Sequence, residues 1–227
     1  GPVMALSVTR GMALAGWPVT LAADFDVEHV TTLDVTGDGS PEMLFTFGPN
    51  VVALEGKGAV PFPMPPPDSP PGTVVPFLRH NSDLSTRMAA GPGFLKRPGG
   101  AGDPLLAAHA RHQGRIVTWN ARTGEASTLF NLVVTPPAIR RDFMAFGDVT
   151  GRVHLVSAEP GMAPAEIAVS PENTVADGGA SGNVLIGPLT GSGIQVAWST
   201  AGGRIRVAGF TSPGAPMTFL GETPGVP

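Results

Sequence analysis

An internal repeat is the feature that most constrains the fold of this chain. Five short segments share one pattern, in which a β-branched residue opens an apolar strand that ends in a small residue or a turn. These segments begin at Val3, Val51, Ile116, Val153 and Ile205. Their mean spacing of about 50 residues is typical of an array of supersecondary units that bury their apolar faces against one another.

Two further apolar strands accompany the repeated segment. In four copies, one of these strands begins roughly ten residues before the repeated segment. This spacing is typical of a hairpin with glycine or asparagine in its turn. These upstream strands are expected over residues 43–47, 105–110, 143–147 and 194–200. A third strand follows every copy, over residues 16–21, 60–64, 126–132, 165–170 and 216–220. The pattern predicts an antiparallel meander that recurs along the chain.

The chain is therefore predicted to be all-β, a β-propeller built of four-stranded antiparallel blades. Four to five blades fall within this sequence, as a closed ring or as part of a larger one. The 31 glycines and 25 prolines disfavour helices, because each costs about 1 or 3 kcal/mol, respectively, inside a helix. The copy at Val3 has no upstream hairpin strand. Closure is expected to use strands from an upstream region, from another chain, or from a blade split between the termini.

We expect a single propeller domain over residues 3–222. An expression scar is expected at residues 1–2, with the natural protein extending further upstream, and a short tail at residues 223–227. A proline- and glycine-rich insertion at residues 59–103 interrupts the repeat. Its proline-dense part, residues 59–76, is expected to run as polyproline II, either as a stiff crossover or as a ligand for a partner's aromatic groove.

Composition argues against several functions. The net charge is −4 and the 14 lysines and arginines are scattered, whereas a nucleic-acid binder needs a basic face. No apolar run approaches the roughly 20 residues of a membrane-spanning helix. The chain has no cysteine, so disulfides, thiolate nucleophiles and cysteine metal sites are excluded.

The sharpest chemical motif is the acidic loop at residues 34–42. Oxygen-bearing side chains stand at its positions one, three, five and nine, which are Asp34, Thr36, Asp38 and Glu42, and a glycine at position six allows a sharp turn. Such a loop could wrap a hard cation that takes six to eight oxygens at about 2.3–2.6 Å, and calcium is the natural choice. It is not an EF-hand, because Phe45 stands at position twelve, where that motif needs a bidentate glutamate. The alternative is an acidic turn without metal.

The first part of the chain resembles the FG-GAP or VCBS repeat family of bacterial surface proteins and integrin α-type propellers. The resemblance is carried by Ala-Gly-Trp-Pro-Val-Thr-Leu at residues 15–21, by the acidic loop, and by Val-Val-Ala-Leu at residues 51–54. It implies one calcium ion, with Asp34, Asp38 and Glu42 as side-chain ligands and Ser40 as a main-chain carbonyl ligand. Thr36 stands where the family usually has aspartate or asparagine, which removes one charge.

The second half is similar to the quinoprotein-like propeller repeats that are also found in outer-membrane assembly scaffolds. The similarity lies in Gly-Arg-Ile-Val-Thr-Trp-Asn-Ala-Arg-Thr-Gly-Glu at residues 114–125 and in residues 146–155. Residues 148–152 copy the beginning of the acidic loop but place Arg152 where Asp38 stands, so we expect a hairpin turn there and a single metal site in the chain. These resemblances cover most of residues 3–210 and imply a fold more than a function.

The sequence lacks the catalytic motifs that were considered. The chain has no Gly-x-Ser-x-Gly elbow and no phosphate-binding Walker loop. His109 and His112 lie three residues apart, and on a strand such side chains point to opposite faces, so we interpret them as surface or turn histidines rather than as a zinc pair. His154 is expected to be an ordinary packed or edge histidine.

The sequence therefore predicts a non-enzymatic β-propeller that serves as a rigid protein- or ligand-binding scaffold with one calcium-stabilised loop. We expect an extracytoplasmic protein, periplasmic, cell-surface or secreted. Its expected partner is another protein or a larger parent chain, and unpaired blade edges offer a route to oligomers. The alternative is an accessory propeller of a larger secreted carbohydrate- or peptide-active enzyme, with the catalytic part outside this sequence.

Overall fold

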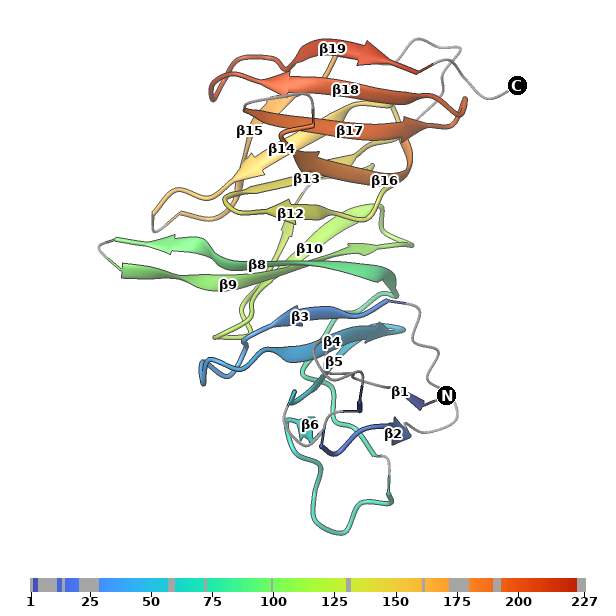
Figure 1. Ribbon diagram of the computed structural model, residues 1–227, viewed down its shortest axis with the longest axis vertical. Helices are drawn as coiled ribbons and strands as arrows, with labels where there is room; N and C mark the ends of the chain where they lie inside the picture. Colours follow the sequence, from blue (N-terminus) through green and yellow to red (C-terminus); the bar gives the residue numbers. More distant parts are fainter. Residues whose placement is uncertain are drawn as a thin grey trace. The chain divides into compact units, whose positions relative to one another are not determined.

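The computed structural model describes residues 2–3, 12–13, 15–20, 29–56, 60–71, 73–98, 100–129, 132–160, 162–171, 180–189 and 193–223. The described residues form strands, bridges, turns and bends (Figure 1), which confirms the all-β prediction. Within these ranges no helix has the length and hydrophobicity needed to cross a membrane. The chain divides into two compact units, Gly1–Met88 and Ala89–Pro227. The single propeller domain over residues 3–222 stays a prediction.

The N-terminal unit contains a strand pair and a five-stranded sheet. The pair joins β1 (Pro2–Val3) to β2 (Val19–Thr20), so Val3, which opens the first repeated segment, pairs with the strand expected to follow that segment. The rest of this segment, residues 4–8, lies outside the described residues. The sheet is formed by β3 (Thr31–Leu33), β4 (Glu42–Phe47), β5 (Asn50–Leu54), β6 (Pro61–Phe62) and β7 (Leu78–Arg79). Its order is β3-β4-β5-β6, and β7 pairs with the beginning of β5. The predicted hairpin of strands 43–47 and 51–54 is confirmed.

The C-terminal unit contains three four-stranded sheets, each a meander of strands that follow one another in the chain. The first sheet is β8 (Leu84–Arg97), which begins in the N-terminal unit, β9 (Gly100–Ala110), β10 (Arg115–Asn120) and β11 (Ala126–Leu129). The second is β12 (Ala138–Arg140), β13 (Phe143–Gly147), β14 (Val153–Ser157) and β15 (Ala165–Val169). The third is β16 (Ala180–Gly187), β17 (Ile194–Thr200), β18 (Ile205–Phe210) and β19 (Thr218–Glu222). The predicted strands 143–147 and 194–200 coincide with β13 and β17.

The proline- and glycine-rich insertion expected at residues 59–103 contains regular strands in the structure. These residues contain β6, β7, the whole of the long strand β8 and the start of β9. Gly102 gives the physical reason, because a side chain there would overlap the carbonyl oxygen of Gly93 on the neighbouring strand. Glycines that suggest a linker in the sequence instead let two strands approach closely. The polyproline II conformation of the proline-dense part stays a prediction.

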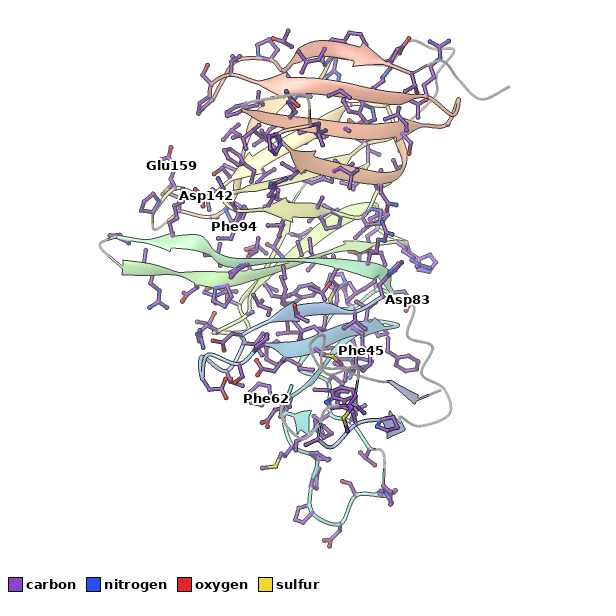
Figure 2. The ribbon with its side chains drawn as sticks, in the orientation of Figure 1. Phe45, Phe62, Asp83, Phe94, Asp142 and Glu159 are labelled. Carbon is purple, nitrogen blue, oxygen red and sulfur yellow. The ribbon has the colours of Figure 1, made fainter. Side chains whose placement is uncertain are left out.

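The second sheet of the C-terminal unit packs on both of its neighbours. Fully buried members of the core between the first and second sheets include Phe94, Ile116 and Phe146, and Figure 2 shows Phe94 between these two sheets. The core between the second and third sheets includes Leu155 and Trp198. Successive residues of one strand therefore serve opposite cores, as the two-residue period of a strand requires.

The first residue of the repeated segment shows which sheet faces are covered. Val51, Ile116 and Val153 are each 0% exposed, whereas Ile205 is 50% exposed. Val153 and Ile205 hold the same place in their hairpins, because each is the first residue of its strand and pairs with the residue six positions before it, Gly147 or Ser199. The third sheet thus keeps the apolar pattern of the other copies but leaves one face partly open to solvent.

This difference in burial predicts a difference in stability. Val153→Asp should lower the free energy of unfolding by roughly 4 kcal/mol or more, because it buries an unpaired carboxylate. Ile205→Asp, the matched change in the last copy, should cost less than about 1 kcal/mol. Denaturant unfolding followed by circular dichroism measures both. Equal losses in the two variants would mean that the face around Ile205 is covered in solution.

Candidate functional site

The acidic loop joins β3 to β4, and its carboxylates bind backbone amides of the loop itself. Asp34 accepts hydrogen bonds from the amides of Gly37 (2.5 Å) and Gly39 (3.0 Å). Asp38 accepts one from the amide of Ser40 at 2.7 Å. Gly37 and Gly39 have φ angles of 84° and 81°, a left-handed conformation that glycine adopts without strain. The loop is therefore closed by local side-chain to backbone bonds.

Glu42, the first residue of β4, holds this loop through hydrogen bonds from the loop backbone. It is only 1% exposed, and its Oε2 accepts hydrogen bonds from the amides of Val35 (2.7 Å) and Thr36 (3.2 Å). The hydroxyl of Thr36 donates to Oε1 at 3.4 Å. Hydrogen bonds from backbone donors compensate for the burial of the carboxylate and give it a structural role that needs no cation.

The five residues predicted to bind calcium lie in the acidic loop and at the start of β4, and within this set the hydroxyl of Thr36 donates to Glu42. Those residues are Asp34, Thr36, Asp38, Ser40 and Glu42. Throughout the described part of the chain, no three His, Cys, Asp or Glu side chains gather as a group that could hold a metal ion. Their oxygen chemistry suits calcium, yet the carboxylates are directed to backbone amides instead. The calcium hypothesis stays a prediction.

Glu42→Gln is expected to lower the free energy of unfolding by roughly 1–3 kcal/mol, because the buried acceptor loses its charge. In a loop without a bound cation, the loss should be the same in calcium and in chelator. Asp38→Asn alters an exposed carboxylate of the same loop and is the control, with an expected change under about 0.5 kcal/mol in chelator. Denaturant melts in about 1 mM calcium or EDTA measure the effects. A calcium-bound loop would instead give a wild type that chelator destabilises and an Asp38→Asn variant that chelator does not affect.

A histidine between two carboxylates ties the second sheet of the C-terminal unit. His154 on β14 has Nδ1 2.5 Å from Oε2 of Glu166 on β15, and Nε2 3.0 Å from Oδ2 of Asp148. Phe146 stacks on the imidazole, with ring centroids 5.4 Å apart and planes inclined by 17°. The side chain of His154 is 16% exposed. The network therefore joins β14, β15 and the turn after β13 in a half-buried place.

Asp148 also holds the turn between β13 and β14. Its Oδ1 accepts hydrogen bonds from the amide and the hydroxyl of Thr150 (2.9 and 2.8 Å) and from the amide of Arg152 (3.0 Å). The hairpin turn predicted for residues 148–152 is confirmed. One carboxylate thus caps the turn with one oxygen and binds the histidine with the other.

The electrostatics of this network favour a charged histidine. Burial by itself lowers the pKa of His154, but hydrogen bonds and charges from Asp148 and Glu166 outweigh it and raise the pKa. Burial by itself raises the pKa of Asp148, and its hydrogen bonds to His154, Thr150 and Arg152 bring that pKa below its usual value. Both imidazole nitrogens face carboxylates, so His154 serves as a cross-strand cation rather than as a general base or metal ligand.

An equivalent tie occurs in the third sheet. Arg206 is the second residue of its repeated segment, as His154 is, and its Nε donates to Oε2 of Glu222 on the outer strand β19 at 3.0 Å. Arg204 donates to the other oxygen of Glu222 at 2.7 Å. Neither tie was predicted from the sequence. Their signal is a basic residue at the second position of the segment, followed by a glutamate on the outer strand.

The raised pKa of His154 predicts that the folded protein loses stability as pH rises. The contribution of the charged histidine is complete below its unfolded pKa of about 6.5 and is lost as pH rises through the higher folded pKa. His154→Gln should remove this part of the pH dependence, and Glu166→Gln should lower the histidine pKa. Imidazole proton NMR titration and denaturant melts at about pH 6 and 9 measure the two effects. A His154 pKa below 6.5 would contradict the assignment.

A cavity of about 480 Å³ opens between the second and third sheets of the C-terminal unit. Phe143, Ile167 and Phe210 form apolar parts of its wall. Ile167 faces this space because β15 has a bulge. Glu166 pairs with one residue of β14 and Ala168 with the residue before it, which leaves Ile167 as the extra residue. Bulges commonly redirect a side chain in this way.

A second, more polar cavity of about 310 Å³ lies over the first sheet. Asp103 on β9 lines it and accepts hydrogen bonds from Arg97 Nε (3.0 Å), Arg97 Nη2 (2.6 Å) and Asn120 Nδ2 (3.0 Å). Burial by itself raises the pKa of Asp103, but these hydrogen bonds and the charge of Arg97 lower it below its usual value. The ion pair closes the β8–β9 hairpin and is a structural tie of the same kind as the His154 network.

The other two histidines considered in the sequence lie in different environments. His109 is inside β9, 9% exposed, and hydrogen-bonded to the backbone of Val133. Burial lowers its pKa. The interpretation as a surface or turn histidine is therefore wrong for His109, whose place on the strand faces a core. The same interpretation is confirmed for His112, which lies exposed in the turn after β9.

Comparison with known proteins bears on the fold alone. No protein-family model matches the chain, and no curated protein sequence matches it. A structure described as a complex of KlAtg21 with the coiled coil of AgAtg16 contains a chain of similar fold, with a TM-score of 0.50 and 12% sequence identity. The similarity covers 98% of this chain and 64% of that one. Fold and geometry together define an all-β protein of repeated antiparallel sheets with charged ties at their turns and outer strands.

Proposed function

We propose that this chain is part of a β-propeller that acts as a rigid, non-enzymatic binding scaffold in an extracytoplasmic protein. The observation that carries the proposal is the recurrent packing of four-stranded meanders, with the first residue of the repeated segment buried in three copies and half exposed in the last. The resemblance to FG-GAP or VCBS repeats and to quinoprotein-like repeats supports the same conclusion. One calcium at the acidic loop belongs to this proposal as a stabilising ion.

The open face of the third sheet supports a ring of sheets. Leu185 on β16 pairs with Ala197, which in turn pairs with Val207, so these side chains share one face. Leu185 is 59% exposed and Ile205 is 50% exposed. A sheet with apolar residues on both faces is stable when both faces are covered. The arrangement suits a sheet that receives a further blade, from the same polypeptide or from a partner.

The charged residues support a scaffold rather than a catalyst. Asp103, Asp148 and Glu222 each bind a cation on a neighbouring strand or turn. These groups are used to fix the positions of strands, and the imidazole of His154 has a carboxylate at each nitrogen. A frame with such ties presents its loops and cavities in fixed positions, which lowers the entropic cost of binding.

A parallel screen of two ligand classes tests the function. The immobilised protein is offered a phage-displayed library of random peptides and a glycan array. We expect enriched peptides with dissociation constants in the micromolar range, about 8 kcal/mol of binding free energy, and their recovery intact by mass spectrometry. Val153→Asp, which should lose the fold, is the control and should enrich none.

Other outcomes would contradict this function. Cleavage of the bound peptides or glycans would make the protein an enzyme. Binding of glycans alone would favour an accessory domain of a secreted carbohydrate-active enzyme. Failure of both arms would remove the scaffold proposal itself.

A further inference from the structure

Aromatic side chains from two sheets form walls of the cavity between the second and third sheets. Phe143 from β13 and Phe210 from β18 lie with ring centroids 5.7 Å apart and planes inclined by 60°. The bulged residue Ile167 lines the same space, and its carbonyl accepts a hydrogen bond from the amide of Gly214 at 2.8 Å. That bond holds the loop after β18 beside the bulge. The apolar walls therefore come from two sheets that are joined at this point.

The rim of the cavity is acidic. Glu159 and Glu166 line it, and none of the described residues that line it is a lysine or an arginine. Glu166 also binds His154, but Asp148 shares the charge of that histidine, so one cation faces two anions and the network stays negative. Figure 2 shows Glu159 directed outward from the loop that follows β14. Its carboxylate adds a further negative charge at the rim.

Met162 extends the apolar wall into solvent. Its side chain is 65% exposed although it lines the cavity, and its amide donates to the carbonyl of Glu159 at 3.0 Å. Methionine is unbranched and polarizable, and it is common at surfaces that adapt to a ligand. The turn thus places a flexible apolar side chain next to a carboxylate at the mouth of an aromatic cavity.

We propose that this cavity binds a lysine or arginine side chain, flanked by apolar residues, from an extended segment of a partner protein. The inference rests on the scaffold function and names the chemistry of its ligand. The aliphatic stem lies against Phe143, Phe210 and Met162, and the cation lies near Glu159 and Glu166. Long basic side chains combine an apolar stem with a charged head, and aromatic faces attract the cation further. A purely apolar ligand would desolvate the rim carboxylates without compensation.

Two matched peptides test the ligand chemistry. The first is acetyl-Gly-Leu-Arg-Leu-Gly-amide, and the second carries neutral citrulline in place of arginine. In protein labelled with ¹³C at the methionine methyl groups, the arginine peptide should shift the resonance of Met162 and leave that of buried Met144 unchanged. We expect it to bind about tenfold more tightly than the citrulline peptide.

Two variants test the place of binding. Glu159→Gln should weaken the arginine peptide several-fold and leave the citrulline peptide unaffected. Asp68→Asn, a change of an exposed carboxylate in the N-terminal unit, is the control and should alter neither. Equal affinities of the two peptides, or no shift at Met162, would overturn the inference. Library peptides that bind without basic residues would refute this ligand while leaving the scaffold function in place.

Discussion

The packing of the second sheet on both of its faces is the constraint on which the rest of the C-terminal unit depends. In β13, Met144 belongs to the core shared with the first sheet, and Ala145 belongs to the core shared with the third. A slip of one residue in the register of β13 would exchange these two sets. Cross-strand pairing is therefore strongly specified.

The apolar cores hold the inner strands in position, and this places the side chains of the polar ties within reach of their partners. His154 and Arg206 both stand at the second position of the repeated segment, and each reaches a glutamate on the outer strand of its sheet. Both outer strands also contain a register shift. A sheet whose inner strands are held by apolar contacts tolerates an irregular outer strand, and the ion pair fastens that strand. These pairs are half-buried, so their effect lies more in fixing geometry than in adding stability.

Much of this fold could be predicted from the sequence, because apolar alternation and turn glycines are local signals. The bounds of β13 and β17 follow from them directly. The strand β8 and the first part of β9 could not be predicted, because the meaning of Gly102 depends on Gly93 across the hairpin. The acidic loop was found as a motif, but the sequence does not show that Glu42 is buried against the amide of Val35. The partners of His154 depend on a bulge, which leaves little trace in a single sequence.

The bulge at Ile167 also has a consequence for how such a repeat acquires new surfaces. One additional residue in an outer strand turns a wall into a recess, while the two inner strands keep their pairing. Insertions or deletions of a single residue can therefore create or remove recesses in this architecture at little expense to its cores. Among copies of the repeat, recognition could then diverge through the lengths of the outer strands more readily than through the identities of the buried residues.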